Sequence, residues 1–184
     1  MAKYVSTAGI PWVVILDAFE YGIRAVPSVT GNTINGYCDV MLYGCSRVSD
    51  NTIAGAESNI GALDCTSVTN NVITGVVRGV DCVATHDYLV SGNRVTLVDD
   101  AAGMGIYSHA SSTSPVVHAV SNYVDAPNAG AHCFYNSSVM IAVGNMITGA
   151  GDFTHATKEP DYARNNISVI RDPYSFVVQT EYTP

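Results

Sequence analysis

The sequence predicts an all-β protein whose short strands follow one another around a stack of similar coils. Valine occurs 25 times, whereas Leu, Glu, Lys and Gln together supply only 12 of the 184 residues, and this balance favours strands over helices. Charged residues make up 13% of the chain, about half of the usual share of roughly 25%. A short motif also recurs seven times along the chain.

Composition and charge exclude several classes of protein. The net charge is −8, and Lys3 and Lys158 are the only lysines, so we expect no nucleic-acid binding and no attachment to anionic membranes. At 47% hydrophobic the chain is too apolar for intrinsic disorder. The most apolar stretch, Ile10 to Leu16, contains Pro11 and stops at Asp17. It is too short for membrane insertion and lacks a convincing signal-peptide cleavage site.

The recurring motif is Asn-x-Ile/Val, with steps of 19, 20, 22, 29, 23 and 20 residues between its asparagines. The motif asparagines are Asn32, Asn51, Asn71, Asn93, Asn122, Asn145 and Asn165. The preceding residue is usually one that tolerates a left-handed backbone, such as Gly31, Asp50 or Asn70. The residue three positions before the Asn is usually apolar, as Val29 and Val48 are. The pattern predicts an inward side chain, a sharp turn and then a new strand.

A period of about 22 residues suits one coil of three short strands. Coils stacked at about 4.8 Å let each strand pair in parallel with the strands above and below. Equivalent side chains then form columns, and the seven motif asparagines are expected to hydrogen-bond to one another as a structural ladder. A β-sandwich with regularly spaced turns is the alternative.

From about Val29 to Ile167, these motif copies resemble the parallel β-helix of the pectate-lyase-like superfamily. The resemblance implies a right-handed, single-stranded parallel β-helix of about seven to eight coils. Proteins of this fold include phage tailspikes, adhesins and enzymes that cleave polysaccharides. The resemblance to pectate lyases would also imply an acid-rich calcium site and an arginine base, but no arginine of the sequence stands in an acid-rich cluster.

We expect residues 1–28 to form an irregular N-terminal coil or cap, residues 29–170 to form the β-helix repeats, and residues 171–184 to form a C-terminal strand or cap. Insertions that leave the stack as loops are expected at 110–115 and 157–161. Open end coils expose apolar side chains and strand edges. A partner subunit, a larger virion assembly or the remainder of a longer chain is therefore expected to cover them, and the resemblance favours a homotrimer.

Acidic residues and histidines near the first insertion are the candidates for catalysis. They are Asp99, Asp100, His109, His132, Asp152 and His155. The three acids follow their motif asparagine by six or seven residues, and paired carboxylates on one edge would suit glycoside hydrolysis. The three histidines recur every 23 residues, which would allow a ladder for proton transfer or metal binding. Solvated turn acids and satisfied histidines are the favoured interpretation, so the catalytic residues stay unknown and no metal site is predicted.

Tyr43, Tyr107 and Tyr135 stand in corresponding parts of their coils and are the candidates for glycan binding. Tyrosine rings surrounded by Asn, Ser and Thr form flat surfaces that stack on sugar rings. The alternative is that these rings pack inside or across the coils.

The five cysteines are odd in number and have no C-x-x-C spacing, which argues against a zinc site or a disulfide framework. Cys45 and Cys65 share an offset from their motif asparagines and are expected to stack as buried thiols. The sequence has no phosphate-binding loop, hydrolase elbow or zinc motif, so no cofactor is expected.

Two functions fit these observations. The favoured one is a virion structural and receptor-binding protein of phage tailspike type, which contacts host surface glycans or other virion subunits and is not an enzyme. Such a protein would be made in the cytoplasm and would end in the virion or outside the cell. The alternative is a polysaccharide-degrading glycosidase or lyase on the same scaffold. A cellular β-helical adhesin is a third possibility, disfavoured by the absence of a clear signal peptide.

Overall fold

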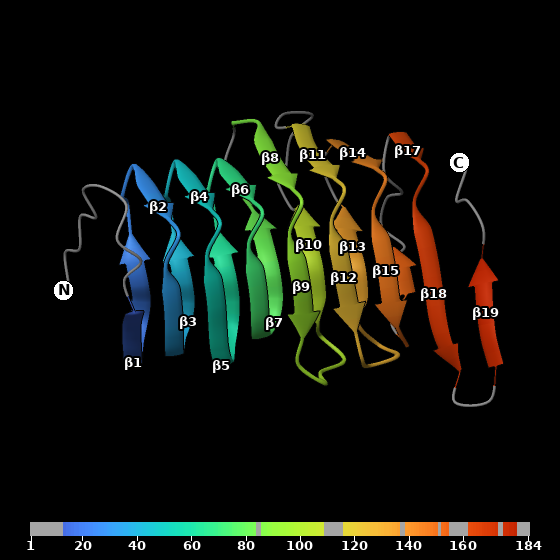
Figure 1. The fold of residues 1–184 in the computed structure, drawn as a ribbon, viewed down its shortest axis with the longest axis horizontal. Coiled ribbons are helices and arrows are strands. Elements are labelled where there is room, and N and C mark those ends of the chain that lie inside the picture. Colours follow the sequence, from blue (N-terminus) through green and yellow to red (C-terminus); the bar gives the residue numbers. More distant parts are fainter. Residues whose placement is uncertain are drawn as a thin grey trace.

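The computed structural model describes residues 13–83, 86–108, 116–136, 139–150, 152–154, 162–172 and 175–179. Within these ranges the chain forms strands and turns and no helix. The strands stack in parallel along one long axis as a β-solenoid, with β1 at one end and β19 at the other (Figure 1). The all-β class and the parallel stacking predicted from the sequence are confirmed.

Nineteen strands are present in the described part of the chain. In chain order they are β1 Val13–Arg24, β2 Ser28–Thr30, β3 Thr33–Tyr43, β4 Arg47–Ser49, β5 Thr52–Leu63, β6 Ser67–Thr69, β7 Val72–Cys82, β8 Tyr88–Ser91, β9 Arg94–Leu97, β10 Met104–Ser108, β11 Val116–Val120, β12 Tyr123–Ala126, β13 His132–Asn136, β14 Val139–Val143, β15 Met146–Gly149, β16 Asp152–Thr154, β17 Tyr162–Arg164, β18 Ile167–Asp172 and β19 Ser175–Gln179. They form a twelve-stranded sheet and a seven-stranded sheet, both of which run along the stack.

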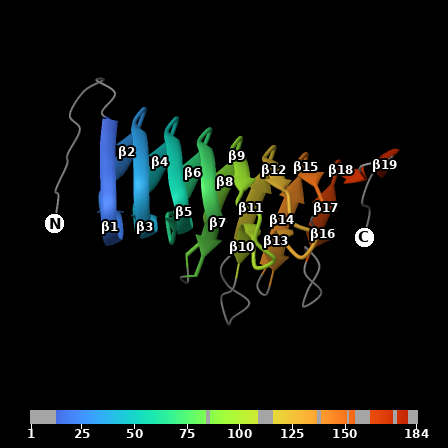
Figure 2. The ribbon, with the colours of Figure 1, turned by 90° about the horizontal axis from the view of Figure 1, so that it is seen from below.

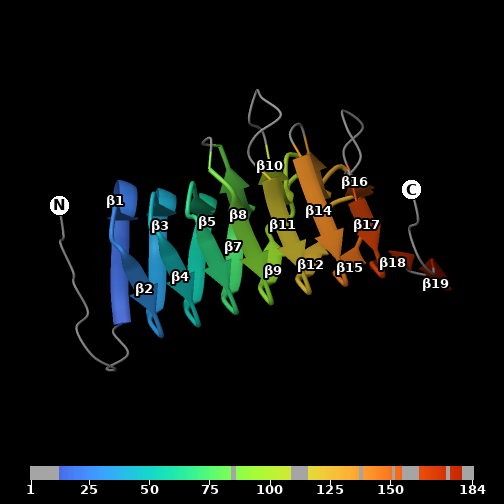
Figure 3. The ribbon, with the colours of Figure 1, turned by 90° about the horizontal axis from the view of Figure 1, so that it is seen from above.

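Each coil presents three outer faces. Face 1 is the seven-stranded sheet, in the order β17-β14-β11-β8-β6-β4-β2, and these short strands follow one another along the stack in Figure 3. The long strands β1, β3, β5 and β7 bend, with irregular register at the bend, so each of them contributes to two faces. Face 2 contains their first halves, followed by β9, β12, β15 and β18. Face 3 contains their second halves, followed by β10, β13 and β16 (Figure 2).

A ladder of asparagine side chains forms the corner between face 1 and face 2. Asn51 shows the pattern: its Nδ2 donates to Asn71 Oδ1 at 2.9 Å and to the Val29 carbonyl at 2.9 Å. Its Oδ1 accepts from the backbone N–H of Asn32 at 2.9 Å and from Asn32 Nδ2 at 3.2 Å. The members are Asn32, Asn51, Asn71, Asn93, Asn122, Asn145 and Asn166. These buried amides satisfy one another and the backbone, which a buried polar group requires.

The last member of the ladder corrects the sequence-based assignment, which placed Asn165 there. Asn145 donates to Asn166 Oδ1 at 2.8 Å, whereas Asn165 has a left-handed φ of 54°. Every ladder asparagine follows such a left-handed residue, and φ lies between 53° and 69° at Gly31, Asp50, Asn70, Gly92, Ser121, Gly144 and Asn165. The assignment was wrong by one residue because two asparagines are adjacent, and either can occupy the left-handed position.

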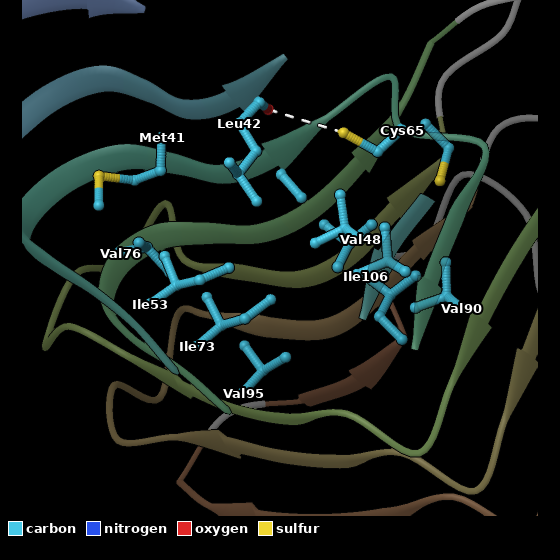
Figure 4. Packing of buried hydrophobic residues seen from close by; sticks show 14 of the residues in the cluster. Met41, Leu42, Val48, Ile53, Cys65, Ile73, Val76, Val90, Val95 and Ile106 are labelled. Atoms are coloured by element: carbon cyan, nitrogen blue, oxygen red, sulfur yellow. Dashed lines mark hydrogen bonds between the residues drawn. The ribbon is translucent and has the colours of Figure 1, made fainter. Parts of the chain in front are cut away.

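The interior is filled by columns of aliphatic side chains. Ile53, Ile73 and Val95 lie in one line and are fully buried (Figure 4). Opposite such side chains the wall of face 3 is made of glycine: Gly61, Gly79 and Gly105 occupy equivalent positions in β5, β7 and β10. A Cβ on the middle glycine would lie 2.5 Å from both the Gly105 carbonyl oxygen and Val95 Cγ1. The interior is narrow here, and only a glycine leaves room for the facing aliphatic side chain.

Strand pairing extends beyond the motif copies at both ends of the stack. β1 pairs in parallel with β3, so solenoid structure begins before the first motif copy. β19 pairs antiparallel with β18 and extends the twelve-stranded sheet beyond the last coil. The expected insertions at 110–115 and 157–161 lie outside the described residues.

Candidate functional site

The predicted glycan-binding tyrosines share one register position along the strands of face 3. The register runs Tyr43–Leu63–Asp81–Tyr107–Tyr135 through β3, β5, β7, β10 and β13. Tyr107 and Tyr135 are direct neighbours in this tyrosine row, whereas two other residues separate Tyr43 from Tyr107. The structure therefore brings two of the three predicted tyrosines together.

A second outer row on face 3 contains two of the catalytic candidates. This histidine row runs Arg78–Met104–His132–Asp152 through β7, β10, β13 and β16. His132 is half-buried, and its backbone is paired with that of Asp152 in the adjacent strand. Since neighbouring parallel strands lie about 4.8 Å apart, the backbone positions of the two candidates lie side by side.

Arg78 connects the two rows. Its Nη1 lies 3.2 Å from Asp81 Oδ2, and its guanidinium carbon lies 5.3 Å from the centre of the Tyr107 ring. Asp81 is 1% exposed, and a buried carboxylate needs such a cationic partner. The carboxylate holds the guanidinium over the ring, and the half-exposed arginine keeps other N–H donors free to meet a ligand. In the sequence, the only signal of Arg78 and Asp81 is their i, i+3 spacing, and neither was predicted as a site residue.

A second arginine–tyrosine cluster lies toward the β1 end of face 3. The Arg24 guanidinium carbon is 5.0 Å from the centre of the Tyr21 ring and 5.2 Å from that of Tyr43. The two ring centres are 5.0 Å apart. A hydrogen bond with Glu20 and its negative charge raise the pKa of Tyr21. Face 3 therefore repeats the same combination of flat rings and a cation at two places along the stack.

Asp99 and Asp100 lie in the exposed turn between β9 and β10, where the structure gives them local roles. Asp99 Oδ1 accepts from Asn128 Nδ2 at 2.9 Å, which joins this turn to the corresponding turn of the next coil. Asp100 Oδ1 accepts from the backbone N–H of Ala102 at 2.7 Å. These bonds are typical of side chains that shape turns. His109 and His155 lie outside the described residues, and in the described ranges no three metal-ligating side chains gather around a common point.

The corner between face 3 and face 1 holds a second cluster that the sequence analysis did not identify. The Tyr88 hydroxyl donates to Asp64 Oδ1, and the ring centres of Tyr88 and His86 are 4.4 Å apart. Thr66 Oγ1 lies 3.3 Å from His86 Nε2. The cluster links a buried tyrosine to an exposed threonine and ties the start of β8 to the preceding coil.

The five cysteines are free and buried, as the sequence predicted. Cys45 and Cys65 stack in consecutive coils at this corner, where the Thr66 N–H bonds to the Cys45 carbonyl at 3.1 Å. A hydrogen bond from the Cys65 thiol lowers the pKa of Cys45 to about 7. The same interaction, followed by burial, raises the pKa of Cys65, so the pair releases one proton far more readily than the second. Both side chains are almost fully buried, and Cys65 also faces the Leu42 carbonyl at 3.8 Å (Figure 4).

No helix in the described ranges is long and apolar enough to cross a membrane. Comparison of the chain with protein-family models, with curated proteins and with solved structures yields no match.

Proposed function

We propose that the chain is a virion structural and receptor-binding component of phage tailspike type, and that face 3 binds host surface glycans. The observation that carries this proposal is the tyrosine row, where Arg78 of the neighbouring row is held over Tyr107 beside the backbone position of Tyr135. A parallel solenoid is suited to such a surface, because each coil repeats the same outer positions at a fixed spacing.

The chemistry of the surface favours uncharged glycans. A tyrosine ring offers a flat apolar area to the C–H face of a sugar, and a fixed guanidinium donates to ring and hydroxyl oxygens. The net charge of −8 repels polyanions over the whole chain. We therefore expect the ligand to be a neutral surface polysaccharide.

Replacement of Tyr107 with alanine is expected to weaken glycan binding about tenfold, or about 1.4 kcal/mol, because the ring under Arg78 is lost. Titration calorimetry with neutral oligosaccharides from bacterial surface polysaccharides measures this. Tyr37→Ala is the matched control, since Tyr37 is 49% exposed and lies outside both arginine–tyrosine clusters. Equal losses of glycan affinity in the two variants would show that the glycan does not bind at the Tyr107 site. An unmodified chain that binds none of these glycans would contradict the proposal.

The alternative function, polysaccharide cleavage, has one observation in its favour. His132 and Asp152 are register neighbours beside the tyrosine row, where a bound glycan would lie within reach of both. A glycosidase or lyase would release reducing ends or an unsaturated product from a glycan that the chain binds, and His132→Ala and Asp152→Asn would each abolish the release. A bound polysaccharide that stays intact on prolonged incubation would reject this alternative and leave the binding role in place.

The proposed class also acts as an assembly. We accordingly propose that the chain forms a homo-oligomer or joins a larger virion assembly.

A further inference from the structure

Face 2 carries an outer row that includes three exposed apolar side chains. The register runs Thr33–Thr52–Val72–Arg94–Tyr123–Met146–Ile167 through seven strands. Val72, Met146 and Ile167 are 39%, 41% and 42% exposed. Three of the six most exposed large apolar side chains in the described ranges thus stand in one row. Single exposed apolar residues are ordinary, but Met146 and Ile167 are direct neighbours on adjacent strands, and neighbouring exposed apolar side chains favour a contact surface.

The neighbouring outer row of face 2 is small and almost uncharged. It runs Asn35–Ala54–Thr74–Thr96–Asp125–Thr148–Val169 in the same register. Arg94 and Asp125 are the only charged side chains in these two rows. A face this flat and this poor in charge can approach a copy of itself, although the chain as a whole has a net charge of −8.

The polar groups of face 2 are already fixed in place. The Arg94 guanidinium carbon lies 4.6 Å from the centre of the Tyr123 ring. The Tyr123 hydroxyl lies 2.8 Å from Thr148 Oγ1, which donates to Asp125 Oδ1 at 2.9 Å. Side chains that are ordered before docking lose little conformational entropy on association.

We propose that face 2 is the contact between two copies of this chain, packed face 2 against face 2 around a two-fold axis parallel to the stack. This inference rests on the proposed function only in that the function requires assembly. Under this symmetry the two rows exchange places, so each row faces the other row of the second copy at the same height. Arg94 of one copy then lies one strand spacing, about 4.8 Å along the stack, from Asp125 of the other. The symmetry makes this contact twice.

The area of face 2 sets the expected affinity of the dimer. Two rows on seven strands cover on the order of 450 Å² per copy, less than the roughly 800 Å² of a standard interface. We therefore expect a weak dimer with a Kd on the order of tens of micromolar, in place of the trimer that the resemblance implies.

Sedimentation equilibrium of the chain over a range of concentrations tests the surface. Met146→Lys is expected to raise the dimer Kd at least about tenfold, because a lysine must be desolvated at the centre of the contact. Leu89→Lys is the matched control: Leu89 is 44% exposed on face 1, and this change should leave the Kd unaltered. A monomeric unmodified chain, a trimer, or equal effects of the two lysines would overturn the inference.

Charge reversal tests the symmetry. Arg94→Glu and Asp125→Arg should each abolish self-association, because each places like charges opposite one another twice. Mixing the two variants should restore a heterodimer, because opposite charges then meet at both contacts; failure to restore it would reject the two-fold packing. Circular dichroism verifies that both variants fold. Glycan binding on face 3 is measured separately, so a failed interface leaves the proposed glycan site intact, and absent glycan binding leaves the dimer intact.

Discussion

Replacing Asn93 with alanine is expected to lower the free energy of unfolding by about 2–5 kcal/mol. Asn93 Oδ1 accepts from the backbone N–H and from Nδ2 of Asn71, both at 3.0 Å. Its Nδ2 donates to the Val68 carbonyl at 2.8 Å and to Asn122 Oδ1 at 3.0 Å. Alanine leaves the buried Asn71 N–H without its acceptor and removes the side-chain donor from the Val68 carbonyl. Urea denaturation followed by circular dichroism measures the loss.

The control for the ladder is Asn59→Ala. Asn59 is exposed, and its Nδ2 makes one long bond of 3.5 Å to Asp39, so the expected loss is below about 0.5 kcal/mol. Asn93→Asp keeps the shape and the acceptors but removes both donors, and it should destabilise at least as strongly as alanine. If Asn93→Ala cost no more than the control, the ladder would not contribute to stability.

Replacing Gly79 with alanine is expected to cost about 3 kcal/mol or more. The new methyl group would lie 2.5 Å from a carbonyl oxygen of the next coil and 2.5 Å from Val95 Cγ1. Neither neighbour can move away cheaply, because the oxygen belongs to a paired strand and Val95 is fully buried. Thermal unfolding monitored by circular dichroism should show a large decrease in Tm or a chain that no longer folds.

Gly44→Ala separates crowding from backbone strain. Gly44 has a φ of 61° and nothing within 4 Å of the position of a Cβ, so alanine there should cost only about 1–2 kcal/mol. Adding Val95→Ala to Gly79→Ala should recover part of the stability by removing one of the two clashes, although Val95→Ala alone destabilises. Strictly additive losses would show that Gly79 and Val95 do not share the same space.

Much of the fold was predictable from the sequence because the solenoid repeats one local arrangement of residues. The left-handed turn, the ladder asparagine and the inward β-branched residue stand next to one another in the chain, so their spacing is visible as a motif. The period of about 22 residues already predicted three strands in a coil, and the bends of β3, β5 and β7 fall at a glycine four residues after the ladder asparagine. Which residues each face turns outward was not predictable from the motif. The column of Gly61, Gly79 and Gly105 also escaped notice, since the need for glycine arises from side chains on the opposite wall.

The candidate site residues were likewise predictable only where they share a position in their coils. Tyr107 and Tyr135 keep a common place in their coils, and the structure puts them side by side. Tyr123 gave no sequence signal and Arg78 only its i, i+3 spacing to Asp81, because the importance of both residues depends on the neighbouring coil and on which side chains face outward. A residue that contacts its partner across coils is 20 to 30 positions away in the chain, and these steps vary with loop length.

The asparagine ladder gives the solenoid an electrical direction. Each side-chain oxygen accepts from the preceding coil, and each side-chain nitrogen donates to the following one, from Asn32 through to Asn166. Dipoles in a β-sheet largely cancel, whereas these amide dipoles add along the axis, as peptide dipoles do in a helix. The β1 end of the corner therefore carries partial negative charge and the β18 end partial positive charge. Two such stacks placed end to end attract each other only when they point the same way.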